Sequence, residues 1–278
     1  MKRKFLYARS YIILILCSII AGYPILWLFC SSFKDSASIF ASIRLLPVSI
    51  DFSGYIDGWK STSLQPFSMF LVNSLKLVIP TVLLTCVSAS LVAYGFTRFT
   101  FPLKKFWFAI MISTLMLPNT ILMIPRYILF RNLRLLNSYS PFYLMAILGA
   151  NPFFAYLLIQ FFRGIPRELD EAATIDGCSR WLIFTRIIIP LSKTPIITVA
   201  LFQTMWTWND FFNPLIYIDS VKMYPVSLGL RLAIDADSTV NWSKIIAMTV
   251  VSMVPLMLMF FSFQRYFVAG IATTGLKG

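Results

Sequence analysis

Residues 163–190 read RGIPRELDEAATIDGCSRWLIFTRIIIP and form the only long polar stretch between two strongly apolar segments in the second half of the chain. The stretch combines both signs of charge, with acids at Glu168, Asp170, Glu171 and Asp176 and arginines at Arg163, Arg167, Arg180 and Arg186. A polar segment with this balance of charges, placed between apolar neighbours, indicates a loop that stays in water and binds another protein.

Local signals divide this stretch into two helices. Pro166 can begin the first, where its missing N–H is not needed, and the acids that follow suit the first turns of a helix. Gly177 suits the helix end, and Ser179 can cap a second helix over 180–188. Pro190 ends that helix or begins the next turn. Trp181, Leu182, Phe184 and Ile187 form its apolar surface. A generic amphipathic connector is the alternative interpretation.

The composition of the whole chain predicts a membrane protein. Of its 278 residues 58% are hydrophobic and only 13% are charged, which is more apolar side chain than a soluble domain could bury. Several segments reach the roughly 20 apolar residues that cross a bilayer. We predict an all-α polytopic fold with six transmembrane spans. They cover about 11–31, 70–96, 106–124, 141–162, 195–216 and 245–267.

The ends and loops fit one transmembrane domain over 1–278. The basic start MKRK precedes an apolar run too long for a signal peptide, so we expect an uncleaved first span. The loops 32–69 and 219–243 are too short to hold a core of their own. The stretch 163–190 then connects spans four and five, and residues 268–278 form a tail.

The formal charge is +13, and the distribution of the basic residues predicts the orientation of the chain in the membrane. Basic residues gather on the cytoplasmic side of membrane proteins, and their distribution places both termini there. Arg126, Arg131 and Arg134 are the exception, and we expect an amphipathic helix at the outer surface for them. No basic run is interleaved with aromatics, so nucleic acid is not an expected partner, whereas membrane lipid is.

Histidine is absent and the four cysteines are scattered, at Cys17, Cys30, Cys86 and Cys178. This pattern excludes histidine-based catalysis and predicts no metal site and no disulfide framework. There are no paired carboxylates in the middle of a span and no Ser/Lys dyad. We therefore expect no catalytic residues and no enzyme activity.

One polar run lies inside the fifth span, at Trp206, Trp208, Asn209 and Asp210. A flat aromatic face beside hydrogen-bonding groups suits a sugar pathway, so these residues are candidates for substrate contact. An interfacial aromatic belt explains the same tryptophans, because Trp is favoured at headgroup depth.

The sequence EAATIDGCSRWLIFTRIIIP resembles the EAA motif of ATP-binding-cassette importer permeases. The motif has Glu-Ala-Ala, three residues, Gly, nine residues, and then Ile-x-Leu-Pro, and only Ile189 departs from it. The resemblance implies that residues 163–190, here called the coupling segment, bind a separate ATPase. The residues implied in coupling are Glu171, Ala172, Ala173, Asp176, Gly177, Trp181, Leu182 and Phe184.

From about Leu71 onward the chain is similar to the maltose-transport branch of these permeases, in NSLKLVIPTVLLTCVSASLVAYGFTRFTFP, WNDFFNPL and RYFVAGIATTGLKG. The resemblance implies import of a di- or oligosaccharide with a second, dissimilar permease, two ATPase subunits and an external sugar-binding lipoprotein. It also implies a bacterial cytoplasmic membrane, and a tail whose Gly275 and Lys277 contact the ATPase dimer.

The chain has no GxxxxGK[ST] sequence and cannot hold ATP phosphates by a P-loop. We therefore expect no cofactor on this chain, and ATP and Mg on the partner ATPases. The alternative is a secondary sugar transporter driven by an ion gradient. It would need intramembrane acids, for which only Asp210 is a candidate.

Overall fold

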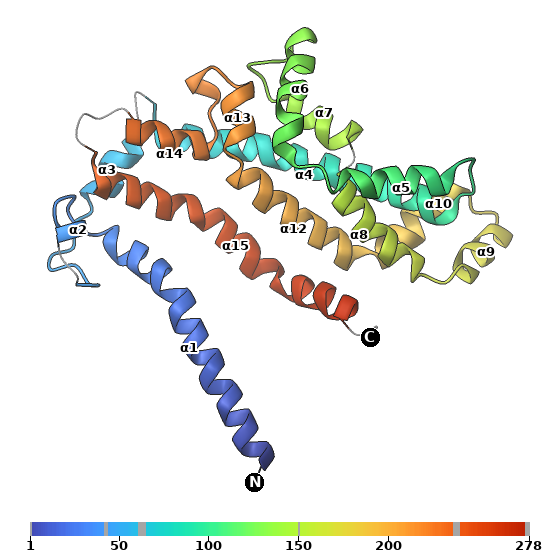
Figure 1. Cartoon of the computed structure of the whole chain (residues 1–278), viewed down its shortest axis with the longest axis horizontal. Helices are drawn as coiled ribbons and strands as arrows, with labels where there is room; N and C mark the ends of the chain where they lie inside the picture. Colours follow the sequence, from blue (N-terminus) through green and yellow to red (C-terminus); the bar gives the residue numbers. More distant parts are fainter. Residues whose placement is uncertain (1, 42–43, 61–64, 150, 236–239, 276–278) are drawn as a thin grey trace. The chain divides into compact units, whose positions relative to one another are not determined.

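The computed structural model describes residues 2–41, 44–60, 65–149, 151–235 and 240–275, and the regular elements in these ranges are all helices (Figure 1). The chain forms two compact units. One contains Met1–Leu71 and Gly229–Val254, and the other contains Val72–Leu228 and Pro255–Gly278. The prediction of a single permease domain stays a prediction.

The first unit contains α1 (Lys2–Ser31), α2 (Ser38–Ala41), α3 (Ser53–Lys60) and parts of α4 (Phe67–Arg98), α14 (Val226–Asp235) and α15 (Trp242–Gly275). Glycines let α3 pack closely on α15. A Cβ at Gly54 would lie 2.5 Å from Ser243 Oγ, and one at Gly58 would lie 2.7 Å from Met248 Cγ. A larger residue at Gly54 would clash with the Ser243 backbone and push the two helices apart, whereas one at Gly58 would require the Met248 side chain to move.

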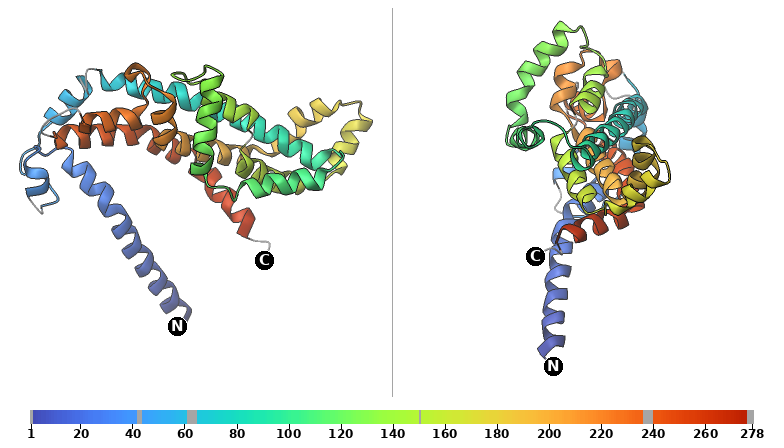
Figure 2. Two further views of the ribbon diagram at one scale, coloured as in Figure 1. Left: turned by 45° about the horizontal axis from the view of Figure 1, so that its top comes forward. Right: turned by 90° about the vertical axis from the view of Figure 1, so that its right-hand side faces the viewer.

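The second unit contains the remaining elements. They are α5 (Lys104–Thr114), α6 (Asn119–Asn132), α7 (Ser140–Leu148), α8 (Pro152–Arg163), α9 (Glu168–Ile175), α10 (Arg180–Ile183), the π-helical turn η1 (Phe184–Ile188), α11 (Ile189–Leu191), α12 (Lys193–Asn209), α13 (Phe212–Tyr217) and the 3₁₀ turn η2 (Val221–Met223). Helix α8 packs against α5 and α12 (Figures 1 and 2). Its Phe154, Leu158 and Phe162 are fully buried in the core that this packing creates.

The all-α membrane fold is confirmed. Among the described residues, four helical stretches are long and apolar enough to cross a membrane, and up to six if each of two bent pairs is one span. The four are Arg9–Ser31, Phe67–Arg98, Ser140–Arg163 and Trp242–Gln264.

The predicted span 106–124 is not one straight helix. It is divided between α5 and α6, which are bent by 103°. Pro118 has a non-helical ψ of 132° and precedes the first residue of α6. A residue before proline is disfavoured in the helical region, so the break lies where the chain reaches Leu117 and Pro118.

The predicted span 195–216 also ends early. Helix α12 stops at Asn209, and Asp210 is extended, with φ −67° and ψ 122°. The Asp210 carboxylate accepts a hydrogen bond from the backbone N–H of Asn213 at 3.2 Å, which favours a new helix start over continuation.

The predicted tail 268–278 is helical as far as Gly275, because α15 continues through it. The chain has no proline after Pro255 that would stop this helix. Lys277, predicted to contact the ATPases, lies outside the described residues.

Candidate coupling surface and transport pathway

The first half of the coupling segment is α9, and it ends at Gly177 as predicted. Gly177 has φ +80°, a left-handed conformation that glycine adopts without penalty. Its N–H donates to the Thr174 carbonyl at 3.1 Å, and the Cys178 N–H donates to the Ala173 carbonyl at 2.9 Å. This pair of bonds is a Schellman helix end, which uses carbonyls that would otherwise have no partner.

The second half begins at Ser179, again as predicted. The Ser179 hydroxyl accepts a hydrogen bond from the Leu182 N–H at 3.3 Å and caps α10. The predicted helix over 180–188 differs in that it widens into η1 and continues through Pro190 to Leu191. A widened turn fits Pro190, which cannot donate to a carbonyl one turn earlier and whose ring would clash there.

The apolar surface predicted for this half is divided between solvent and core. Trp181 is 63% exposed, whereas Phe184 is 6% exposed and packs with its ring centroid 4.9 Å from that of Tyr94. Phe184 is therefore not part of an exposed docking surface. Residues 181 and 184 are only about 60° apart around a helix, but the end of α4 lies against this turn and covers Phe184.

The coupling residues of α9 also differ in their surroundings. Glu171, Ala172 and Asp176 are exposed, while Ala173 is buried in the core. Beside them a cavity of about 520 Å³ is lined by Arg98, Arg167, Asp170, Glu171, Thr174, Ile175 and Arg180. The exposed acids and Trp181 are thus available to a partner, and Ala173 is small because it packs against the helix behind it.

The end of α4 holds both halves of the coupling segment. The Arg98 side chain forms an ion pair with Asp170 at 2.6 Å between Nε and Oδ2. The Tyr94 hydroxyl donates to the Arg180 carbonyl at 2.9 Å, and Arg167 donates to the Thr97 carbonyl at 3.0 Å. The sequence does not predict these contacts, because nothing in the local pattern links residues so far apart in the chain.

A second cavity, of about 540 Å³, contains two of the predicted pathway residues, Trp206 and Asp210. Trp206 is 46% exposed, and its ring lies 4.9 Å from that of Phe154 at an angle of 31°. The Asp210 carboxylate accepts a hydrogen bond from Asn213 Nδ2 at 2.7 Å. Further polar side chains line the same cavity, namely Thr81, Thr85, Thr114, Asn119, Arg126, Asn151, Gln203, Thr207 and Asn213.

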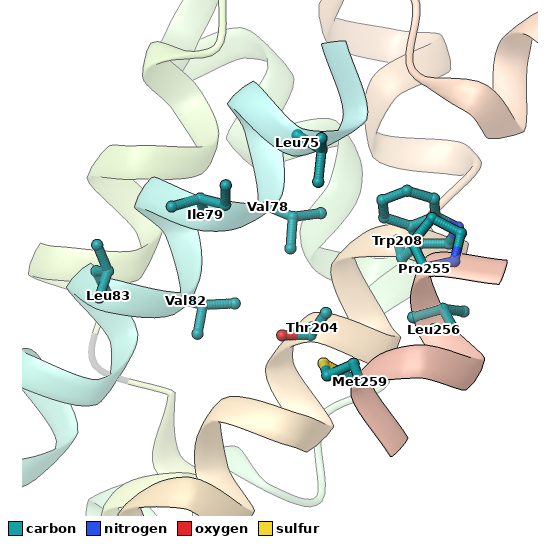
Figure 3. Close-up of a pocket in the computed structure, with 10 residues that line it drawn as sticks. All are labelled: Leu75, Val78, Ile79, Val82, Leu83, Thr204, Trp208, Pro255, Leu256 and Met259. Atoms are coloured by element: carbon teal, nitrogen blue, oxygen red, sulfur yellow. The ribbon is translucent and has the colours of Figure 1, made fainter. Parts of the chain in front are cut away.

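The other two residues of the run lie elsewhere. Trp208 is 6% exposed and lines a separate apolar pocket of about 270 Å³ between α4, α12 and α15 (Figure 3). Asn209 is exposed, and its amide donates to the Met205 carbonyl at 2.8 Å. The sequence does not single out Gln203 and Asn213, and it predicts Arg126 for an amphipathic helix at the outer surface and not for this cavity. Arg126 carried a signal, because its charge lies in an otherwise apolar segment.

Comparison with known proteins agrees with this architecture. A bacterial ATP-binding-cassette transporter involved in the import of the acidic polysaccharide alginate has a chain with the same fold, with a TM-score of 0.83, 22% identity, and coverage of 96% of this chain and 98% of that one. This chain therefore has the fold of that transporter chain.

Sequence relatives agree. The profile described as binding-protein-dependent transport system inner membrane component matches residues 86–273, and the chain belongs to this family. The probable ABC transporter permease protein YurM of Bacillus subtilis is 32% identical, over 96% of this chain and 88% of the relative. The arabinooligosaccharides transport system permease protein AraQ of Halalkalibacterium halodurans is 31% identical over the full length of both chains.

Proposed function

We propose that this chain is a permease subunit through which a di- or oligosaccharide enters a bacterial cell across the cytoplasmic membrane. Membership of the permease family and the similarity to a permease for arabinooligosaccharides support this proposal. Both termini lie in the cytoplasm, in keeping with the distribution of basic residues.

The proposed assembly contains a second, dissimilar permease, two ATPase subunits and an external sugar-binding lipoprotein. ATP and Mg bind to the ATPase subunits, and this chain binds no cofactor, in keeping with its lack of a P-loop sequence. The coupling segment, with Glu171, Asp176 and Trp181 on its surface, meets the ATPases, and the end of the tail reaches the interface between them.

The observation that carries the substrate class is the cavity beside Trp206. It combines an aromatic ring with hydroxyl and amide groups, which is the chemistry that sugar rings and their hydroxyls require. Its volume falls within the range of about 300–1,000 Å³ that is common for small-molecule sites.

The mechanism is alternating access. ATP draws the ATPases together, the coupling segments follow, and the helices of this chain tilt between inward-open and outward-open states as rigid bodies. ATP drives the change only if it binds the closed ATPase dimer more tightly than the open one.

Purification of the chain from its own cells with its native partners tests this function. We expect a P-loop protein to accompany the chain, and the complex in proteoliposomes to take up labelled maltose or arabinotriose only with ATP and the lipoprotein. Uptake by the chain alone, driven by a proton or sodium gradient, would instead establish a secondary transporter.

A further inference from the structure

The end of α4 is the part of the molecule on which the coupling segment is fixed. Arg98 forms two contacts with that segment, the ion pair with Asp170 and a hydrogen bond from Nη2 to the Ile165 carbonyl at 3.1 Å. Further links in this region include the hydrogen bonds of Tyr94 and Arg167, and the Arg180 guanidinium lies 5.7 Å from the centre of the Phe99 ring. Both helices of the coupling segment are therefore attached to one short stretch of one span.

The Arg98–Asp170 pair differs from a surface ion pair. The two side chains are 4% and 14% exposed, so water does not screen the interaction strongly. The second carboxylate oxygen, Asp170 Oδ1, is buried and has no hydrogen-bond partner among the described residues. A carboxylate held this way depends on its arginine, because removal of one partner leaves an uncompensated buried charge.

Asp170 thus has a different position from its acidic neighbours in α9. Glu168 and Glu171 are exposed, where a docking partner can reach them. Asp170 points toward α4, so its charge pairs with Arg98 within this chain and is not presented to a partner.

We propose that Arg98 and Asp170 are positioning residues that transmit the movement of the coupling segment to the transmembrane span α4. This inference rests on the proposed function, and it adds the physical link within this chain. Movement of α9 pulls on the buried pair, and because α4 is a single helix from Phe67 to Arg98, a force on its end displaces the whole span. Without the pair, the hydrogen bonds that remain between the coupling segment and α4 transmit less of the movement, and more ATP is hydrolysed for each sugar molecule moved.

The test is the number of sugar molecules imported per ATP hydrolysed, measured in proteoliposomes with the complete complex, the lipoprotein and labelled maltose or arabinotriose. For Asp170→Asn in the assembled complex we expect this ratio to fall about tenfold, within the roughly 5- to 150-fold range of typical coupling between sites. Lys105→Gln neutralises an exposed charge outside the coupling segment and is the control, with an unchanged ratio.

The double variant Arg98→Gln/Asp170→Asn removes both buried charges and leaves two amides that can still hydrogen-bond. We expect it to assemble better than either single variant and to recover part of the ratio, and it serves as the test if Asp170→Asn does not assemble. A lower yield of complex with an unchanged ratio in the assembled fraction would reduce the pair to a structural role and overturn the proposal. Absence of any ATP-dependent uptake by the unmodified complex would refute the proposed function itself, and the inference with it.

Discussion

The coupling segment and the run from Trp206 to Asp210 both stand out from the apolar chain, and they are organised in opposite ways. In the coupling segment, the spaced motif residues all lie in or beside two short helices, α9 and α10, that follow one another in the chain. In the run, adjacent residues lie at the end of one helix and point into different surroundings, because each helical residue is rotated by about 100° from the last. The residues of the spaced motif therefore belong to one local structure, whereas the adjacent residues of the run do not.

The largest expected effect comes from Gly177, at the junction of the two coupling helices. We expect Gly177→Trp to reach the membrane in normal amount and to abolish sugar uptake. The left-handed conformation costs a non-glycine residue about 1–2 kcal/mol. Apart from Gly177 itself and its two neighbours in the chain, no atom of the described residues lies within 4 Å of a Cβ placed there, so the side chain would extend into space that a docked ATPase would use.

Uptake of labelled sugar by cells, with an immunoblot of the membrane fraction, measures this effect. Gly177→Asn is the control, because asparagine tolerates the left-handed region best among the other residues. Normal uptake by Gly177→Trp would contradict the proposal that this segment binds the ATPases.

Substitutions of Phe184 and Trp181 test whether the first is buried in the core and the second exposed on the surface of the coupling segment. We expect Phe184→Ala to destabilise the chain by about 3–5 kcal/mol, as for other buried aromatic residues, and to lower its melting temperature in detergent. Trp181→Ala should leave that temperature unchanged and weaken ATPase binding by about 2 kcal/mol, as for a central aromatic contact. Equal melting temperatures for both variants would contradict the burial of Phe184.

The sequence predicted the local features of the coupling segment and missed its attachment. Helix ends such as Gly177 and Ser179 are determined by backbone conformation and nearby hydrogen bonds, so a few neighbouring residues suffice to find them. The pairing of Arg98 with Asp170 depends on the packing of two helices, which no local pattern contains. The bend at Pro118 lies between these cases, because proline signals a break but not its angle.

Trp206 and Trp208 allow a cavity residue and a buried residue of the same run to be compared. We expect Trp206→Ala to raise the KM for sugar uptake roughly tenfold, since a stacking surface worth about 1.4 kcal/mol would be lost from the cavity. Trp208→Ala should leave KM unchanged and lower the melting temperature instead, because Trp208 lies in the apolar pocket between α4, α12 and α15. An unchanged KM for Trp206→Ala would favour the aromatic-belt interpretation of this residue.

The smallest effect is expected at Asp210, and it separates the two transport mechanisms. In the structure this carboxylate accepts hydrogen bonds from the Asn213 N–H and Nδ2, and its role is to start α13. Asp210→Asn keeps a side-chain oxygen for the backbone N–H, so ATP-dependent uptake should change by less than about twofold, as for a substitution that preserves a helix cap. Asp210→Ala removes both acceptors and should lower uptake further.

An ion-gradient transporter behaves differently at the same position. Such a mechanism needs an acid that binds a proton or a cation within the membrane, and Asp210 is the sole candidate in the run. Asp210→Asn would then abolish uptake as fully as Asp210→Ala does. Uptake measured in parallel for the unmodified chain and both variants, with ATP supplied and the ion gradients intact, therefore distinguishes a helix start from an ion site at one residue.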